Sequence, residues 1–325
     1  MRIGIAYDLK DDYLAEGFSE EAAAEFDQVD TIVAIETALA AAGHATDRIG
    51  NARRLIARLA DGDRWDMVFN IAEGLHGLGR ESLVPALLDA YRIPYTFSDP
   101  VVLGLSLHKG LAKHAVRDLG VPTPDFAVVA DRLDAVAVAL PCPLFVKPVA
   151  EGTSKGINAR SKVTEPGDLP DVCVELLRTF HQPVLVETYL PGREFTVGVL
   201  GTGRRARAVG VLEVSVRGHA ETDAYSFATK KNYRDLVDYS RLEGELAQPC
   251  LDLALRVWRG LGCRDAGRVD IRLDAAGIPN FLEVNPLAGL HPVDSDLPII
   301  CRLSGIAYGQ LIEQIMESAR ERLSA

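Results

Sequence analysis

Two short segments near the C-terminus constrain the fold of this chain most, because together they predict a β-hairpin with one polar and one apolar face. Residues 268–273 (RVDIRL) and 280–285 (NFLEVN) both alternate polar and apolar side chains. The DAAG sequence after the first segment is typical of a turn in which Gly277 supplies a positive φ. Successive side chains of a strand point to opposite faces, so each strand has one polar face. If these faces coincide, they bring together Arg268, Asp270, Glu283 and Asn285.

The polar face of this hairpin would combine two carboxylates, an amide oxygen and a guanidinium. Hard oxygen ligands of this kind suit Mg²⁺ that bridges the phosphates of a nucleotide. The alternative is a solvated face with surface ion pairs. We favour the ion site, because both strands also have a clean apolar face and the sequence NPLAG follows the second strand at once.

The first hundred residues alternate strand-like and helix-like segments. Residues 2–7 and 67–71 read as strands, and a long helical pattern ends at Gly43. This alternation predicts a doubly wound parallel α/β domain. After about residue 107 strands outnumber helices, which indicates α+β organisation. We therefore expect three units, at residues 1–104, 105–187 and 188–325.

Length, composition and charge narrow the classes of function. A chain of 325 residues is long enough for two or three domains. Its 35 Lys and Arg against 46 Asp and Glu give a net charge of -11, which argues against nucleic acid as a partner. No membrane span or signal peptide is apparent, so we expect a cytoplasmic protein. The five widely spaced cysteines indicate neither a disulfide framework nor a zinc site.

A lysine and a small-residue loop in the middle of the chain are typical of a phosphate site. Lys147 emerges from an apolar strand (PLFVKP), where an ammonium needs an anionic partner unless it is exposed. The loop EGTSKG follows, with Thr153 and Ser154. Such a loop can present backbone N–H groups and positive charge to phosphate. Taken alone, the loop is better explained as an ordinary turn, since the GxxxxGK[ST] pattern is absent.

A further strand, VLVET at residues 184–188, ends in polar and aromatic residues suited to a purine nucleotide. Backbone groups there can bind a base edge, while Glu187 or Glu194 accepts hydrogen bonds from an amine or ribose hydroxyls. A strand end followed by a surface loop is the simpler alternative.

The order of these motifs resembles the ATP-grasp superfamily. Within it, the sequence is most similar to D-alanine:D-alanine ligases, over about residues 64–320. FVKP and the hairpin carry the resemblance to the superfamily, whereas IPYTFS, EGTSKGI and GREFTVGVL carry the resemblance to the ligases. The resemblance implies a two-part ATP-grasp fold after the N-terminal domain. It also implies an ATP-dependent carboxylate–amine ligase that forms an acyl phosphate, with small amino acids as partners and a homodimeric assembly.

The resemblance assigns roles residue by residue. For ATP it implies phosphate contacts from Lys109, Lys147, Lys230 and Ser154, and base or ribose contacts from Glu187, Tyr189, Leu190, Glu194 and Leu282. For two Mg²⁺ ions, which Mn²⁺ can replace, it implies Asp270, Glu283 and Asn285. For the oxyanion it implies Arg268 and the Gly289 N–H, beside Thr153 in the loop. For the amino acids it implies Ser295, His76 and Glu25.

Departures from the family pattern concentrate at the amino-acid site. The N-terminal Gly-Gly turn and its glutamate are missing, and an acidic run at residues 16–30 takes their place. Glu25 is the nearest substitute, although a solvated helix face explains the same charges. Lys231 stands where the family has tyrosine, and Pro286 begins a divergent run after the hairpin. The reaction is therefore better specified than the substrate, for which D-alanine is the leading choice.

Other functions share parts of this pattern. A ligase for another dipeptide or a secondary-metabolite precursor would share the nucleotide-site residues. A small-molecule kinase would need no oxyanion donor, so that replacing Arg268 would affect binding more than turnover. A non-catalytic nucleotide-binding regulator disagrees with the full set of charges, and a Rossmann dehydrogenase lacks GxGxxG after the first strand. A polar stretch at residues 217–239 is expected to form a lid that excludes water from the acyl phosphate.

Overall fold

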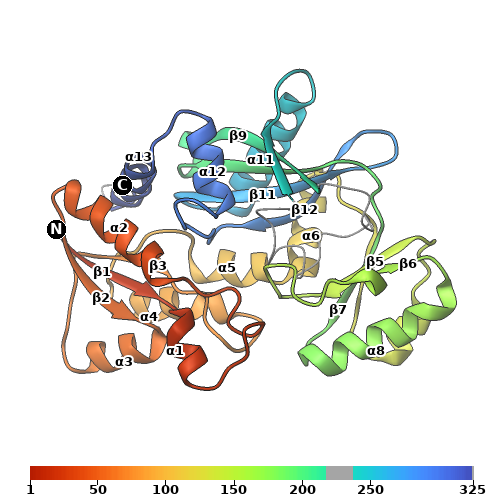
Figure 1. Ribbon diagram of the computed structural model, residues 1–325, viewed down its shortest axis with the longest axis horizontal. Helices are drawn as coiled ribbons and strands as arrows, with labels where there is room; N and C mark the ends of the chain where they lie inside the picture. Colours follow the sequence, from red (N-terminus) through yellow and green to blue (C-terminus); the bar gives the residue numbers. More distant parts are fainter. Residues whose placement is uncertain (217–236, 324–325) are drawn as a thin grey trace.

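The computed structural model describes residues 1–216 and 237–323. Its N-terminal part is a three-stranded parallel sheet in the order β2-β1-β3, with helices on both faces (Figure 1). The expected doubly wound α/β arrangement is thus confirmed. The elements are β1 (Arg2–Tyr7), α1 (Lys10–Ala15), α2 (Val29–Ala41), β2 (Ala45–Gly50), α3 (Ala52–Ala60), β3 (Met67–Ile71), the 3₁₀ helix η1 (Arg80–Ser82) and α4 (Leu83–Ala90).

Apolar side chains explain how this sheet is covered. All five residues of β3 are buried, as in a strand that is packed on both faces. One face packs against α2 and the C-terminal α13 (Tyr308–Glu321) through Ile35 and Ile315. The other face packs against α3 and α4 through Leu55 and Leu88. The carboxyl ends of the strands therefore point toward the rest of the molecule, where ligands of open α/β sheets bind.

The acidic run at residues 16–30 does not form the helix face that would explain its charges. α1 ends at Ala15 and α2 begins only at Val29. Gly17 has a φ of +92°, which ends the first helix, and most of the residues up to Phe26 form turns. The bridge between Leu9 and Asp27 closes this segment into a loop. The loop brings Glu25 against other parts of the molecule, whereas Glu16 and Glu20 pair with Arg53 and Lys10 of the N-terminal part.

A four-stranded antiparallel sheet in the order β4-β7-β5-β6 forms the centre of the chain. Helices α7 and α8 cover one face of it through a compact apolar cluster that includes Cys173. Two helices, α5 and α6, connect it to the N-terminal part (Figure 1). The elements are α5 (Pro100–Leu107), α6 (Lys109–Asp118), β4 (Phe126–Val129), α7 (Arg132–Ala137), β5 (Leu144–Pro148), η2 (Ala159–Ser161), β6 (Lys162–Val163), η3 (Pro166–Asp168), α8 (Leu169–Phe180) and β7 (Val184–Thr188).

The C-terminal part is a five-stranded antiparallel sheet in the order β10-β9-β8-β11-β12. Helices α6 and α11 pack on one face around the fully buried Trp258, and α12 packs on the other. The predicted hairpin is confirmed as the antiparallel pair β11 and β12. The elements are β8 (Glu194–Leu200), η4 (Gly203–Arg205), β9 (Arg207–Val216), β10 (Val237–Arg241), α11 (Ala247–Leu261), β11 (Ala266–Leu273), β12 (Pro279–Asn285) and α12 (Asp296–Leu303).

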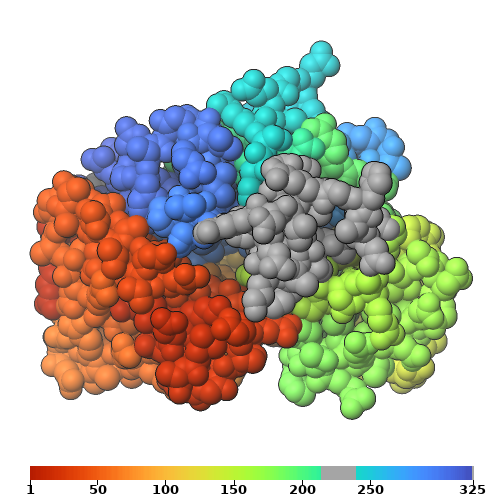
Figure 2. Space-filling view, viewed as in Figure 1, coloured from red at the N-terminus to blue at the C-terminus, as the bar shows by residue number. Residues whose placement is uncertain are grey.

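The three parts meet around one region. In Figure 2 the N-terminal part, coloured red and orange, borders the blue C-terminal segments on one side and the yellow-green central part on the other.

The five cysteines are all free, and four of them are buried, as expected for small apolar residues. Among the described residues, no helix is both long and apolar enough to cross a membrane.

Candidate active site

Two adjoining cavities lie where the three parts meet. The wider one, of about 370 Å³, extends from the N-terminal part to the end of β12, and the narrower one, of about 110 Å³, lies between β5, β7 and β11. Five residues line both cavities, so the cavities form one continuous site. These are Lys109, Glu151, Gly152, Thr153 and Glu283.

Two residues that line the narrower cavity, Lys147 and Glu187, belong to a buried cluster of two lysines and one glutamate. Lys147 on β5 and Lys113 on α6 each place Nζ 2.8 Å from a carboxylate oxygen of Glu187 on β7. Burial alone raises the pKa of Glu187, but the two ammonium groups lower it to about 2. Burial lowers the pKa of Lys113 to about 8 against the attraction of Glu187. Glu187 therefore holds the two lysines in place, and its predicted contact with adenine or ribose stays a prediction. Sequence reasoning missed Lys113, because nothing local distinguishes it from a surface lysine.

The other predicted nucleotide contacts gather at the far end of this cavity. Arg272 on β11 approaches Glu194 at 3.2 Å and donates to the Tyr189 hydroxyl at 3.3 Å, while its guanidinium lies 5.2 Å from the Tyr189 ring centre. An aromatic ring, an aliphatic wall and a carboxylate thus surround a space that suits a base and its ribose. The predicted residues that line it are Lys147, Ser154, Glu187, Tyr189, Leu190, Glu194 and Leu282.

The β11–β12 hairpin brings its polar residues together at the boundary of the two cavities. Asp270 lies opposite Glu283, and its carboxylate accepts from Thr196 Oγ1 at 2.9 Å and Asn285 Nδ2 at 3.2 Å. Burial and the repulsion of Glu283 raise the pKa of Asp270 to about 7, against the attraction of Arg268, with which Asp270 forms an ion pair. Glu283 in turn lies 3.3 Å from Lys109 Nζ.

The small-residue loop after β5 contacts the N-terminal part. The Gly152 N–H donates to Glu25 Oε1 at 2.7 Å, and Lys155 Nζ lies 3.1 Å from the same oxygen. Arg80 approaches the other oxygen of Glu25 at 2.8 Å. Burial alone raises the pKa of Glu25, but these cations lower it to about 2. Thr153 in this loop has a φ of +51°, a strained conformation of the kind found at ligand-binding loops.

Glu25 lines the wide cavity as predicted, yet both of its oxygens already have partners. Two carboxylates that sequence reasoning missed, Glu73 and Glu81, line the same wall. Neither has a hydrogen bond or ion pair with any part of the chain that the structure describes. The signal for Glu73 was available, since it follows β3 at the carboxyl edge of a parallel sheet. The position of Glu81 depends on the tertiary fold.

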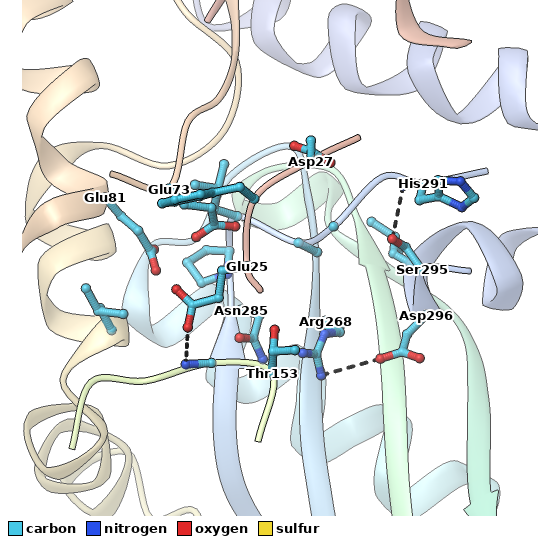
Figure 3. A pocket seen from close by; sticks show the side chains of 18 of the residues that line it. Glu25, Asp27, Glu73, Glu81, Thr153, Arg268, Asn285, His291, Ser295 and Asp296 are labelled. Atoms are coloured by element: carbon cyan, nitrogen blue, oxygen red, sulfur yellow. Dashed lines mark hydrogen bonds and ion pairs between the residues drawn. The ribbon is translucent and has the colours of Figure 1, made fainter. Parts of the chain in front are cut away.

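The opposite wall of the wide cavity carries Arg268, Gly289 and Ser295. Ser295 Oγ accepts from the His291 N–H at 3.0 Å and lies close to Gly289, where an added Cβ would meet it at 2.9 Å. Figure 3 shows Arg268 and Asp296 facing each other beside this wall.

Two predicted residues are not part of either cavity as described. His76 is exposed in the loop before η1 and lines neither cavity, so its predicted contact with the substrate stays a prediction. Lys230, its neighbour Lys231 and most of the predicted lid fall in residues 217–236, outside the described residues. Tyr239, at the end of that stretch, lines the wide cavity.

Three comparisons identify the chain. Residues 116–317 match the family described as D-ala D-ala ligase C-terminus. The chain is 34% identical over 261 residues to an uncharacterised protein of Sinorhizobium fredii, with 79% of this chain and 75% of the other covered. It is 32% identical over 286 residues to a D-alanine–D-alanine ligase of the same organism, covering 87% of this chain and 89% of that one. A D-alanine–D-alanine ligase from Bacillus anthracis complexed with ATP has the same fold, with a TM-score of 0.73 and 22% identity over 100% of this chain and 99% of that one.

The fold and the comparisons together define an ATP-grasp enzyme, an ATP-dependent ligase of small molecules. The chain belongs to the D-alanine–D-alanine ligase family. The expected resemblance to this family, the fold class and the general reaction are thereby confirmed.

Proposed function

We propose that the chain phosphorylates the carboxylate of one amino acid with ATP and joins it to the amine of a second, with D-alanine as the first candidate for both. One observation carries this proposal: Lys109 and Glu283 form an ion pair and line both cavities. They therefore lie where the phosphate of a nucleotide in one cavity would meet the carboxylate of a substrate in the other. D-alanine comes from the names of the relatives. A role in peptidoglycan synthesis, a cytoplasmic location and a homodimeric state belong to the same proposal.

ATP would occupy the narrower cavity. Lys109 and Lys147 would provide positive charge for its phosphates, and Ser154 in the loop would donate a hydrogen bond to them. Lys230, outside the described residues, would add a third positive charge. Phosphoryl transfer depends mainly on positioning and on cations around the phosphate oxygens. Tyr189, Leu190, Glu194 and Leu282 would hold the base and ribose.

Asp270, Glu283 and Asn285 fit two Mg²⁺ ions, which Mn²⁺ can replace. The donor set consists of hard oxygen ligands, and the raised pKa of Asp270 reflects burial and the repulsion of Glu283, which a divalent cation would relieve. Mg²⁺, when bound, neutralises charge on the transferred phosphate. In this structure Arg268 and Lys109 balance the same carboxylates.

The reaction would proceed in two steps with balanced bonds. An oxygen of the first carboxylate attacks the γ-phosphorus, the bond to the β-phosphate oxygen breaks, and ADP leaves. The amine of the second amino acid attacks the acyl carbon, phosphate leaves with the C–O bond electrons, and the nitrogen loses a proton. Arg268 and the Gly289 N–H would stabilise the oxyanion beside Thr153, and Ser295 would receive the second carboxylate.

The proposal also takes the units 1–104, 105–187 and 188–325 as separate domains. Each of the three sheets lies within or close to one unit. Strand β7 ends at Thr188, so the second boundary belongs in the turn between Thr188 and Glu194.

The proposal is tested with purified protein, Mg-ATP and D- and L-amino acids, supplied singly and in pairs. We expect release of ADP and phosphate that depends on the amino acid, together with a dipeptide mass by mass spectrometry. Absence of stimulated ADP release with every acid and amine would refute the ligase proposal. Formation of a phosphorylated product without a dipeptide would indicate a kinase.

A further inference from the structure

The acidic wall of the wide cavity carries more negative charge than its own cations balance. This wall includes Glu81 on η1, which is only 9% exposed and lines the cavity. Figure 3 shows the carboxylates of Glu81 and Glu25 facing each other, with Glu73 and Asp27 along the same wall. Glu81 and Glu73 have no hydrogen-bond or ion-pair partner among the residues at 1–216 and 237–323.

The nearby cations are already committed to other carboxylates. Arg80 binds Glu25, and Lys155 binds both Glu25 and Glu151, the latter at 2.5 Å. Lys109, the next cation along the cavity, faces Glu283 and donates to the backbone oxygen of Glu151 at 2.6 Å. Glu73, Glu81 and Asp27 are then the carboxylates of this wall that have no cation of their own within residues 1–216 and 237–323.

The electrostatics of the wall agree with a missing cation. Burial raises the pKa of Glu81 to about 7, with Glu25 adding to this and Arg80 and Lys109 opposing it. Burial, Glu81, Glu25 and Asp27 raise the pKa of Glu73 against Arg80. Burial raises the pKa of Asp27 to about 7, although Thr31 donates a hydrogen bond to it. A cationic ligand group reverses these shifts, because an opposite charge within a few ångströms favours the ionised carboxylate.

We propose that Glu73 and Glu81 bind a positively charged side-chain group of the substrate in the wide cavity, so that one of the two joined amino acids is basic. This inference rests on the proposed ligase function and refines its substrate. An α-ammonium carries one positive charge and can offset only one carboxylate of the wall. A second ammonium or a guanidinium offsets another, and two carboxylates from separate elements, η1 and the loop after β3, can hold it from two sides.

The first test compares substrates in the ADP-release assay. The panel contains D- and L-alanine and both enantiomers of 2,3-diaminopropionate, ornithine, lysine and arginine, each alone and paired with alanine. We expect a basic amino acid to give a kcat/KM at least tenfold above that of alanine. Alanine as the best substrate would overturn the inference and leave the proposed function standing. No stimulation by any amino acid would remove the proposed function, and this inference with it.

The second test places the recognition at the wall. Glu81→Gln keeps the shape of the side chain and removes its charge, and Glu73→Gln does the same from the other element. We expect each substitution to lower the ratio of kcat/KM for the basic amino acid to kcat/KM for the neutral one by about 10- to 100-fold, mainly by raising KM. This is the fold-change expected when one charge-assisted hydrogen bond is lost. The matched control Glu245→Gln changes an exposed glutamate outside both cavities and should leave the ratio unchanged.

The variants should fold, because the neutral glutamine suits a buried site at least as well as a carboxylate whose pKa burial has raised. Thermal melts and the KM for ATP check this directly. A fall in kcat/KM of equal size for basic and neutral amino acids, with the melting temperature and the KM for ATP unchanged, would show that Glu81 does not recognise a side-chain cation.

Discussion

The buried Lys113–Glu187–Lys147 cluster predicts that two charge-removing substitutions will have unequal effects on stability. Glu187 has both neighbouring cations within 2.8 Å, and its pKa falls from 4.5 to about 2. A shift of that size corresponds to about 3 kcal/mol of stability at neutral pH. Glu187→Gln removes this contribution and leaves two buried ammonium groups without their carboxylate. We therefore expect it to lower the unfolding free energy by about 3 kcal/mol, in line with other broken buried ion pairs.

Lys113→Met should cost much less. The pKa of Lys113 is lowered from 10.5 to about 8, so that its charged form already costs about 3 kcal/mol in the folded protein at neutral pH. Methionine removes this cost and fills a similar volume, while Glu187 loses one of its two cations and keeps Lys147. These two effects offset each other, and we expect a net change within about 1 kcal/mol.

Thermal unfolding measures both effects. At roughly 2 to 4 °C per kcal/mol for a large domain, Glu187→Gln should lower the melting temperature by roughly 6 to 12 °C at pH 7. Because folding lowers the pKa of Glu187, the contribution of this residue to the unfolding free energy is complete above about pH 4.5 and is lost as the pH falls toward 2. The gap to the wild type should therefore narrow below pH 5. Lys113→Met that destabilises as much as Glu187→Gln, or a gap that does not change with pH, would refute this reasoning.

Two further substitutions test the walls of the site. Arg268→Gln should lower kcat by about 10²- to 10³-fold while changing the KM for ATP only slightly, because Arg268 lines the wide cavity and would stabilise the proposed oxyanion there. Steady-state kinetics check this, and a change confined to KM would contradict it. Glu25→Gln should speed trypsin cleavage after Lys155 in limited proteolysis, because the loop loses the ion pair from Lys155 to the N-terminal part. Unchanged cleavage would show that the ion pair between Lys155 and Glu151 holds the loop without the charge of Glu25.

The nucleotide half of the site could be predicted from the sequence because its residues lie on strands, in which side chains alternate between the two faces every second residue. The alternation in β11 and β12 alone places Asp270, Glu283 and Asn285 on one face. Lys147 follows from the same kind of pattern on β5. The sequence does not show that Glu187 is the partner of Lys147, because Glu187 comes 40 residues later. Only the pairing of β5 with β7 shows that the two residues share a face of the sheet.

The substrate half could not be predicted in the same way, because its contacts join distant segments. Glu25 meets Arg80 across 55 residues and Gly152 across 127 residues. The acidic run that contains Glu25 reads as a solvated helix face until Gly17 and the bridge at Asp27 fold it into a loop. Resemblance alone assigns His76 to the substrate, and in the structure it is exposed and lines neither cavity.

The distribution of charge along the wide cavity suggests how a substrate would be oriented. Cations lie toward the hairpin, where Arg268 and Lys109 border the proposed phosphate site. At the other end lie Glu73 and Glu81 of the N-terminal part, carboxylates that have no ion pair with the part of the chain that the structure describes. A zwitterion placed in such a field turns its carboxylate toward the hairpin and its ammonium toward the acidic wall. That orientation brings the carboxylate to the nucleotide, as acyl phosphate formation requires. A second cation on the substrate strengthens the same orientation, so the charges that would select a basic amino acid would also align it for phosphorylation.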